Sequence, residues 1–280
     1  MGLTRGLPPP PPRLTATVID AHTHLDACGA TDPAGVRAVL DRAEAVGVAA
    51  VVTVADDMAS ARWVVQAAGW DERVFAAVAL HPTRTATMTD DDRAELEQLA
   101  AAPRVVAVGE TGLDYYWDYS PRAAQHDAYR WHIDLAKRVG KPLMIHDRDA
   151  HADVLAILKE ERPPPTVIFH CFSGDAAMAR TCVDAGYVLS FAGTVTFRNA
   201  RALRAAAVLV PDEQLLVETD APFLAPHPHR GKANEPVNLP YTIRDLAALR
   251  GQDEAELAAS ISATAERVFG FGAADTVGRS

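Results

Sequence analysis

Eight short apolar runs, rich in β-branched residues, recur along this chain of 280 residues, and a segment with helical spacing follows each of them. Two more helical stretches, 239–249 and 254–269, follow a long loop after the last run. This alternation predicts an α/β fold, a parallel (β/α)8 TIM barrel that forms a single domain. The runs that we expect to form its strands are 17–20, 48–54, 74–80, 105–108, 142–145, 166–169, 187–191 and 215–217.

A doubly wound open sheet is the structural alternative, because it also alternates strands with helices. Such a sheet usually has fewer strands, and a nucleotide-binding example carries Gly-x-Gly-x-x-Gly after its first strand. This chain has His22 and His24 at that place instead. The barrel is therefore the better interpretation.

The expected barrel spans residues 16–272, between a proline-rich amino-terminal tail of residues 1–15 and a carboxyl-terminal tail of residues 273–280. Five consecutive prolines in the first tail favour an extended, flexible segment. This tail also lacks the apolar core of a signal peptide. We therefore expect neither tail to belong to the barrel domain.

Proline and glycine mark the expected ends of several helices. Pro33 and Pro121 should occupy the first turns of two helices, with Asp32 and Ser120 as the residues that cap them. Gly140 follows a helical segment at a place where a left-handed residue is needed to stop the helix.

The acidic composition limits the classes of partner. A formal net charge of −10 and a sequence pI near 5.4 argue against a protein that coats duplex DNA through a broad basic surface. They permit an enzyme that takes a nucleic-acid end into a small pocket where metal ions supply positive charge. Three cysteines without Cys-x-x-Cys spacing are typical of reduced thiols, and no stretch is suited to span a membrane. We expect a cytoplasmic protein without a membrane or a stable protein partner.

Metal-competent side chains follow five of the expected strands. A His-x-His pair ends the first strand, and alternate side chains of a strand share a face, so both imidazoles can point at one ion. The carboxyl ends of parallel strands meet at one mouth of a barrel. Scattered core histidines would not favour this end of each strand, so we predict a metal site there. Its six expected ligands are His22, His24, Glu110, His146, His170 and Asp220.

Four imidazoles and two carboxylates are too many ligands for one tetrahedral ion with an open position. They suit two divalent ions that share a bridging water and a bridging carboxylate, for which Glu110 is the natural choice. Asp220 could serve as a metal ligand, as the acceptor of the water's proton, or as both. Glu110 and Asp220 are thus the expected catalytic residues, and Mg²⁺, Mn²⁺ and Zn²⁺ all suit the ligands.

Five motifs that follow one another along the chain resemble those of the TatD family of metal-dependent deoxyribonucleases. The resemblance extends from about Val18 to Phe271, and every ligand position in it is filled. The motifs are Asp20-x-His22-x-His24, the run 109–115, Ile145-His146-x-Arg148, the run 170–174 and the run 218–222, with shorter matches at 80–82, 191–193 and 230–236.

This resemblance implies both a ligand assignment and an activity. Characterised members of the family hydrolyse phosphodiesters, which implies trimming of DNA from its 3′ ends. The implied partner is therefore DNA, with single-stranded ends as the substrate. One ion would be held by His22, His24 and Asp220 and the other by His146 and His170, with Glu110 as the bridge.

Five further residues are candidates for contact with the substrate. His81 follows the third strand and could contact the substrate or the leaving group. Arg148 could hold a phosphate oxygen or pair with a neighbouring aspartate. Phe172 could stack on a base or pack in the core. Arg230 and Lys232 lie in a Gly/Pro loop that either overhangs the mouth or carries solvated charge.

The other histidines and Cys171 need no catalytic role. His126, His132 and His151 fall in expected helices, where surface or core is the ordinary place for them. Strand alternation should turn Cys171 away from the ions. The second His-x-His pair, His227-Pro228-His229, lies in a proline-rich loop and is either a coincidence or part of the rim.

Three functions remain open on these observations. The first is a two-metal phosphodiesterase that acts on DNA, with 3′–5′ exonuclease action on single-stranded ends as the expected activity. The second is a two-metal amidohydrolase or esterase that acts on a cyclic amide, a lactone or an aminoacyl ester. Related barrels often bridge their metals with a carboxylated lysine, and Glu110 at that place favours the first function. The third, a non-catalytic binding protein, is disfavoured by the complete ligand set.

Overall fold

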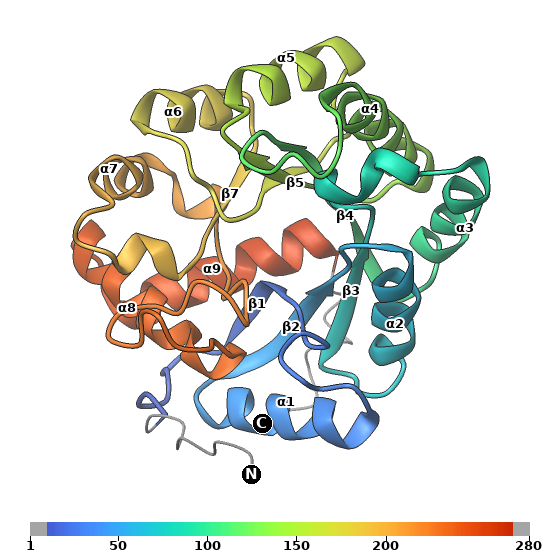
Figure 1. Ribbon diagram of the computed structural model, residues 1–280. Coiled ribbons are helices and arrows are strands. Elements are labelled where there is room, and N and C mark those ends of the chain that lie inside the picture. Colours follow the sequence, from blue (N-terminus) through green and yellow to red (C-terminus); the bar gives the residue numbers. More distant parts are fainter. Residues whose placement is uncertain (1–9, 271–280) are drawn as a thin grey trace.

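Eight parallel strands form one sheet in which each strand is hydrogen-bonded to the next along the chain. Figure 1 shows this sheet at the centre of the molecule with the helices around it. The structure, a computed structural model, describes residues 10–270. The predicted (β/α)8 TIM barrel is confirmed. Its strands are β1 (Val18–Thr23), β2 (Val48–Val54), β3 (Val74–Val78), β4 (Val105–Asp114), β5 (Leu143–Arg148), β6 (Val167–Phe169), β7 (Val188–Phe191) and β8 (Leu215–Val217).

A helix follows every strand, as the helical spacing predicts. The α-helices of the described chain are α1 (Pro33–Ala45), α2 (Met58–Ala68), α3 (Asp90–Ala100), α4 (Arg122–Val139), α5 (His151–Glu161), α6 (Ala176–Asp184), α7 (Arg201–Leu209), α8 (Leu239–Arg250) and α9 (Glu254–Phe269). Four short 3-10 helices, which the spacing does not predict, are η1 (Pro82–Thr87), η2 (Gly193–Thr196), η3 (Asp212–Gln214) and η4 (Pro236–Asn238).

The expected helix boundaries are confirmed with one exception. Asp32 caps α1 through its side chain, and Gly140 ends α4 in the left-handed region at φ 66. Helix α4 begins one residue later than expected, because Pro121 itself is the capping residue. The prediction that Ser120 caps this helix is wrong. Its hydroxyl instead accepts the N–H of Ala86 in η1 at 3.1 Å, which connects η1 to the loop between β4 and α4.

The interior of the barrel is apolar at its amino-terminal end. Side chains such as Ile19, Val52 and Leu216 form one buried cluster, and Val268 and Phe269 from the last turn of α9 belong to it. Helix α9 also contacts η3, the turn that leads into β8. This helix therefore covers the end of the barrel at which the strands begin, and Figure 1 shows it running beside β1.

The seam between β1 and β8 closes at the opposite end. Thr23 and Ala221 form an isolated parallel bridge across it. The N–H of His24 donates to the carbonyl oxygen of Ala221 at 2.8 Å, and the N–H of Asp220 donates to that of His22 at 2.9 Å. Backbone bonds at the seam thus hold three of the expected metal ligands in place.

Parts of the expected tails lie outside the described residues, namely 1–9 and 273–280. Within the remainder of the first tail, Leu14 is buried and its N–H donates to the carbonyl oxygen of Val46 at 3.0 Å. Arg244 of α8 donates to the carbonyl oxygen of Pro12 at 2.9 Å. Residues 12–14 therefore contact the barrel. Among the described helices none combines the length and apolarity that a membrane crossing requires.

Candidate metal centre

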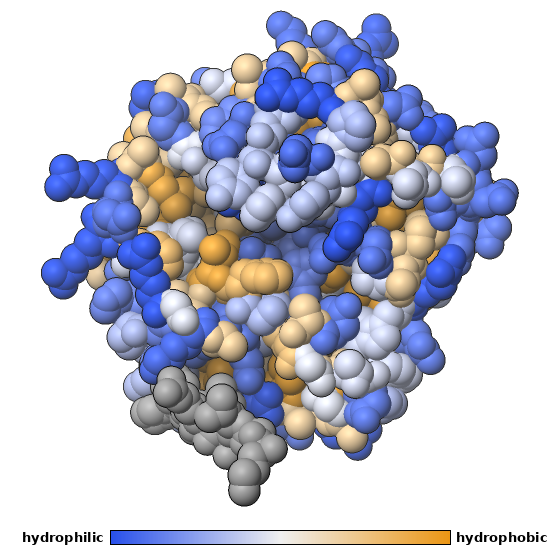
Figure 2. Space-filling view, viewed as in Figure 1, coloured by the Kyte–Doolittle hydropathy of each residue, from blue (hydrophilic) through white to orange (hydrophobic). Residues whose placement is uncertain are grey.

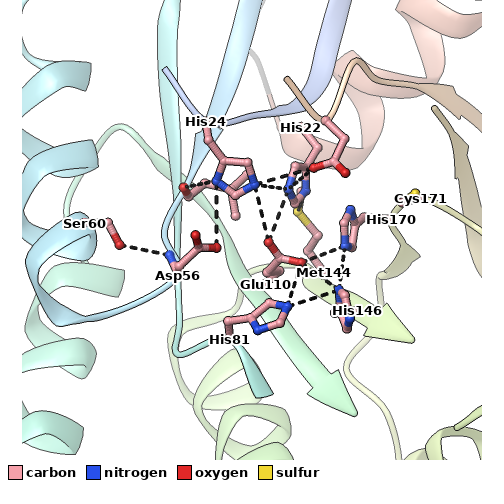
Figure 3. A network of polar contacts seen from close by, with 12 residues as sticks. His22, His24, Asp56, Ser60, His81, Glu110, Met144, His146, His170 and Cys171 are labelled. Atoms are coloured by element: carbon pink, nitrogen blue, oxygen red, sulfur yellow. Dashed lines mark hydrogen bonds and ion pairs between the residues drawn. The ribbon is translucent and has the colours of Figure 1, made fainter. Parts of the chain in front are cut away.

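The six expected ligands come together at the carboxyl ends of the strands, and Figure 3 labels His22, His24, Glu110, His146 and His170 among them. His22 belongs to β1 and His24 directly follows it, while Glu110 and His146 belong to β4 and β5. His170 follows β6 directly, and Asp220 follows β8 by three residues. Four of these side chains, those of His22, His24, Glu110 and His170, are buried almost completely, and those of His146 and Asp220 are only 16% and 14% exposed.

One subset consists of His22, His24 and Asp220. The Nε2 atoms of the two imidazoles lie 3.2 Å apart, and Asp220 Oδ1 lies 3.6 Å and 3.5 Å from them. Ligands at about 2.0–2.1 Å from a tetrahedral ion lie about 3.3 Å from one another. The three donor atoms are therefore spaced as ligands of a single ion. Two imidazole nitrogens and one carboxylate oxygen are also ligand types that divalent ions bind.

A second subset consists of His146, His170 and Glu110. Glu110 Oε2 lies 2.7 Å from His170 Nε2 and 3.0 Å from His146 Nδ1. The two imidazole nitrogens are 3.3 Å apart. These distances also suit one ion.

Glu110 faces both subsets with different oxygen atoms. Its Oε1 lies 3.5 Å from His22 Nε2 and 3.6 Å from His24 Nε2, whereas its Oε2 faces His146 and His170. A carboxylate in this position has one oxygen for each subset. The arrangement is what a bridging carboxylate between two ions requires.

Two glycines bring Glu110 to this position. Strand β4 runs ten residues and so extends beyond the expected end at residue 108, which places Glu110 in its middle. A Cβ on Gly112, whose φ is 139, would lie 2.1 Å from the carbonyl oxygen of His146. A Cβ on Gly109 would lie 2.4 Å from the Cβ of Met144 and 2.9 Å from its carbonyl oxygen. Only glycine therefore permits β4 to approach β5 this closely.

The second nitrogen of each imidazole has a partner of its own. His24 Nδ1–H donates to the carbonyl oxygen of Val54 at 3.0 Å, and His22 Nδ1 lies 3.2 Å from the sulfur of Met144. His170 Nδ1 contacts Glu218 Oε1 at 3.2 Å, and His146 Nε2 contacts Asp114 Oδ2 at 3.1 Å. Partners of this kind fix the ring orientation and tautomer of metal-binding histidines. The residues that hold the four rings this way are Val54, Met144, Glu218 and Asp114.

Sequence reasoning gave no role to Asp20 and Glu218, although both lie within the quoted motifs, and it did not place Asp114 behind a ligand. Asp20 is fully buried and accepts hydrogen bonds from the N–H and hydroxyl of Thr219. Burial raises the pKa of Asp20 to about 8, although these hydrogen bonds act to lower it. Asp56, which no motif contains, lies 3.9 Å from His24 Nδ1. Their positions, two to four residues from a ligand in the sequence, are the signal that could have identified Asp20, Asp114 and Glu218 as supporting residues.

Electrostatics keeps the two central carboxylates ionised. Burial opposes the charge of Glu110, but the imidazoles of His170 and His22 lower its pKa well below the usual value. Burial also opposes the charge of Asp220, but a hydrogen bond from His24 and the nearby imidazoles of His22 and His170 together lower its pKa. Burial also opposes a charge on His24, whose pKa nevertheless rises to about 10 beside Asp220 and Asp56. The centre thus favours positive charge opposite its carboxylates, and metal cations supply such charge.

A pocket of about 670 Å³ opens over the centre, and Figure 2 shows a hollow near the middle of this face. Of the predicted ligands, His24, Glu110, His146, His170 and Asp220 line it. Its wall also includes Arg84, Trp117 and Tyr119, which sequence reasoning did not single out, together with Phe223 and Leu224. No motif or spacing marks these residues, since their places depend on how the loops fold.

Three of the five expected substrate-binding residues line the pocket. His81 Nε2 lies 3.4 Å from His146 Nδ1, and His81 follows β3 by three residues as the cap of η1. Arg148 makes no ion pair with a neighbouring aspartate, and its guanidinium lies 3.9 Å from the ring centre of Tyr116. Phe172 is 3% exposed and packs on Phe191 at 5.8 Å between ring centres, so most of its ring belongs to the core.

Arg230 and Lys232 are exposed and are not among the residues that line this pocket. The guanidinium of Arg230 lies 4.3 Å from the ring centre of Phe197. His229 of the second His-x-His pair is buried against Tyr241, at 5.0 Å between ring centres. Neither charged residue reaches the centre in this arrangement.

The remaining expectations concern residues without a catalytic role. His126, His132 and His151 lie in α4 and α5, as predicted. His132 is buried, accepts the N–H of Leu80 and bonds to the carbonyl oxygen of Ala128. Cys171 lines the pocket, which strand alternation did not predict. Burial and the surrounding carboxylates raise the pKa of its thiol well above the usual value, so it remains a poor nucleophile.

Comparison with known proteins identifies the family. A family model described as TatD related DNase matches residues 19–270. The "Uncharacterized metal-dependent hydrolase TatD" of Mycobacterium tuberculosis is 62% identical over 260 residues, which cover 91% of this chain and 98% of the relative. A relative in Musicola paradisiaca, named "3'-5' ssDNA/RNA exonuclease TatD", is 34% identical over 243 residues, 84% of this chain and 92% of the relative.

Among solved structures, the crystal structure of YJJV, a TatD homologue from Escherichia coli, is similar to this chain with a TM-score of 0.84 and 30% identity. The match covers 91% of this chain and 98% of that one. Sequence and fold therefore agree over nearly the whole described chain, and the protein belongs to the TatD family of metal-dependent hydrolases.

Proposed function

We propose that the protein is a two-metal phosphodiesterase that removes nucleotides from the 3′ ends of single-stranded DNA. The observation that carries the proposal is the carboxylate of Glu110, whose two oxygens face two different sets of imidazoles at 2.7–3.6 Å. The name of the Musicola paradisiaca relative, a 3'-5' ssDNA/RNA exonuclease, supports the substrate class.

The ligand assignment follows the two subsets. His22, His24 and Asp220 would hold one divalent ion, His146 and His170 the other, and Glu110 would bridge them. Such a pair supplies an acidified water and polarises the phosphate. Asp220 lines the pocket, and its lowered pKa keeps it in the carboxylate form that accepts a proton from an attacking water.

His81 is suited to donate a hydrogen bond to the phosphate or to the leaving oxygen. The N–H of Thr83 donates to His81 Nδ1 at 3.2 Å, so the ring proton resides on Nε2, the atom that faces the centre. Burial and the neighbouring His146 lower the pKa of His81 to about 3. The ring is therefore neutral near pH 7 and offers its Nε2–H.

Metal-dependent cleavage of oligonucleotides tests this proposal. Protein stripped of metal is reloaded with Mg²⁺, Mn²⁺ or Zn²⁺ and incubated with 5′-labelled single-stranded and double-stranded DNA. We expect stepwise shortening of the single strand from its 3′ end, and we expect a phosphorothioate cap at that end to block it. Metal analysis should give two ions per chain.

Two variants accompany the measurement. Asp220→Asn should abolish cleavage, whereas Asp91→Asn, an exposed carboxylate at the start of α3, should cleave as the wild type does. Absence of cleavage with all three metals would refute the nuclease proposal. Metal-dependent hydrolysis of a cyclic amide, a lactone or an aminoacyl ester by the same samples would then favour an amidohydrolase or esterase.

A further inference from the structure

Three exposed aromatic side chains stand at the edge of the pocket, on the loop between β4 and α4. Tyr116, Trp117 and Tyr119 are 55%, 43% and 62% exposed. Within residues 10–270, six large apolar side chains are exposed, and four of them are these three and Phe223, which also lines the pocket. Large apolar groups gathered in this way mark a binding surface.

The three rings form an ordered surface. Trp117 and Tyr119 are stacked, with ring centres 5.3 Å apart and planes 8° from parallel. Tyr116 meets Trp117 edge to face at 4.8 Å. Trp117 and Tyr119 line the same pocket as His146 and Asp220. We call Tyr116, Trp117 and Tyr119 the aromatic shelf.

Hydrogen bonds between side chains and the backbone fix the loop that carries the shelf. Asp114 Oδ1 accepts the N–H groups of Tyr116 and Trp117, both at 2.9 Å. The side chain of Gln125 accepts the N–H of Asp114 at 2.8 Å and donates to the carbonyl oxygens of Asp114 and Ser120, each at 3.0 Å. Both ends of the loop are therefore held by α4.

The same aspartate connects the shelf to the metal centre. Asp114 Oδ2 lies 3.1 Å from His146 Nε2, while Oδ1 holds the loop. Asp114 is 1% exposed, so water competes little for these bonds. One carboxylate thus sets the distance between the aromatic rings and a ligand of the hydrolytic centre.

Positive charge lies beside the rings. The guanidinium carbon of Arg148 is 3.9 Å from the ring centre of Tyr116 and 6.0 Å from that of Trp117. Arg148 lines the pocket, and so does Arg84. Proteins that bind single-stranded nucleic acid combine aromatic faces for the bases with cations for the backbone.

We infer that the aromatic shelf binds a nucleobase of a single strand near the scissile phosphate, with Arg148 beside the adjoining phosphate. This inference rests on the proposed nuclease function and adds a subsite to it. Stacking tolerates every base, because each has a π-face. The bases of a duplex are covered by their neighbours, so the shelf also selects single strands.

Binding to strands with and without bases tests the inference. The metal-loaded protein is titrated into a fluorescein-labelled thymidine strand whose phosphorothioate linkages slow cleavage, and into the same backbone with abasic residues. Stacking of one base is worth about tenfold in Kd, so the wild type should prefer the base-bearing strand by about that factor. Trp117→Ala and Tyr119→Ala should each lose most of this preference.

Matched variants separate stacking from a change of fold. Trp117→Phe keeps an aromatic ring and should keep most of the preference. Leu209→Ala, an exposed aliphatic residue on α7 outside the pocket lining, should bind both strands as the wild type does. Binding of the base-bearing strand should quench tryptophan emission in the wild type and quench it less in Trp117→Phe.

The outcomes that overturn the inference differ from those that overturn the nuclease function. Equal binding of the two strands by the wild type, or undiminished preference in Trp117→Ala, would remove the shelf from substrate binding even where metal-dependent cleavage persists. Failure to bind either strand, together with absence of cleavage, would refute both proposals. Tighter binding of an aromatic peptide than of the thymidine strand would assign the shelf to another ligand.

Discussion

The two ends of the barrel are built from the same strands and have opposite character. At the amino-terminal end, apolar side chains form a buried cluster with the last turn of α9. At the carboxyl-terminal end, imidazoles and carboxylates lie 2.7–3.6 Å apart around one centre. Leu216 of the cluster and Asp220 of the centre are only four residues apart at β8. Stability and chemistry therefore occupy different ends of each strand.

The largest expected effect is on activity at the carboxyl-terminal end. Changing a residue that only orients a metal ligand costs about 10- to 100-fold, so Asp220→Ala should lower kcat/KM by about a thousandfold or more. The thermal midpoint of the metal-free protein should change by only a few degrees, because the apolar cluster is untouched. Steady-state cleavage and circular dichroism measure the two effects. Activity within tenfold of the wild type would refute the assigned role.

The converse substitution lies at the other end of the same strand. Leu216 is fully buried in the apolar cluster, so Leu216→Ala should lower the free energy of unfolding by about 3 kcal/mol. The folded variant should retain its kcat at 25 °C, since Leu216 belongs to the apolar cluster and not to the ligand set. Urea unfolding and cleavage assays provide the comparison. A folded variant without activity would show that the two ends are coupled.

A smaller effect is expected from a residue behind a ligand. Glu218 Oε1 accepts the N–H of Cys171 at 2.8 Å and contacts His170 Nδ1 at 3.2 Å. Glu218→Gln keeps the shape and removes the charge, so metal affinity should fall by about tenfold. Competition with a chelator measures this affinity, and kcat at saturating metal should change less. Unchanged affinity would show that the charge of Glu218 does not act on His170.

The last expected effect concerns pH and lies away from both ends. Burial lowers the pKa of His132 to about 4, below its ordinary value of 6.5. A depressed pKa means that the folded state excludes the proton, so this contribution is complete above pH 6.5 and is lost as the pH falls toward 4. Linkage gives a loss of about 2 kcal/mol between pH 7 and pH 5.

His132→Gln retains an acceptor for the N–H of Leu80 and cannot titrate. Its unfolding free energy should depend on pH less steeply than that of the wild type, by about this 2 kcal/mol, over the same interval. Urea unfolding at pH 7 and pH 5 provides the measurement. Parallel pH profiles of the two proteins would mean that His132 is not responsible for acid sensitivity.

The barrel and the ligand set could be predicted from the sequence, because each depends on local patterns within one strand or one strand–helix pair. The alternation of eight strands with helices specifies the fold. A polar residue at the carboxyl end of an apolar strand then lies at the mouth of the barrel. The length of β4 was not predictable, since it depends on how closely Gly109 and Gly112 let β4 approach β5. Glu110 consequently lies inside a strand and not at its end.

The pocket wall was less accessible to sequence reasoning. Arg84, Trp117 and Tyr119 line it because η1 and the loop after β4 fold back over the centre, and no periodicity encodes such loops. Arg230 and Lys232 were expected near the mouth because their loop follows β8, yet they are absent from the pocket lining. A position directly after a strand therefore predicts a metal ligand well, whereas a position in a longer loop predicts contact with the pocket poorly.

The seam between β1 and β8 has a consequence for the newly made chain. His22 and His24 lie at the end of the first strand and Asp220 follows the last, so the first subset spans most of the described sequence. A chain still on the ribosome holds its two leading histidines long before Asp220 has been synthesised. The donor set is assembled only when the last strand docks against the first. We therefore expect no hydrolytic activity before the barrel closes, and none in fragments that lack Asp220.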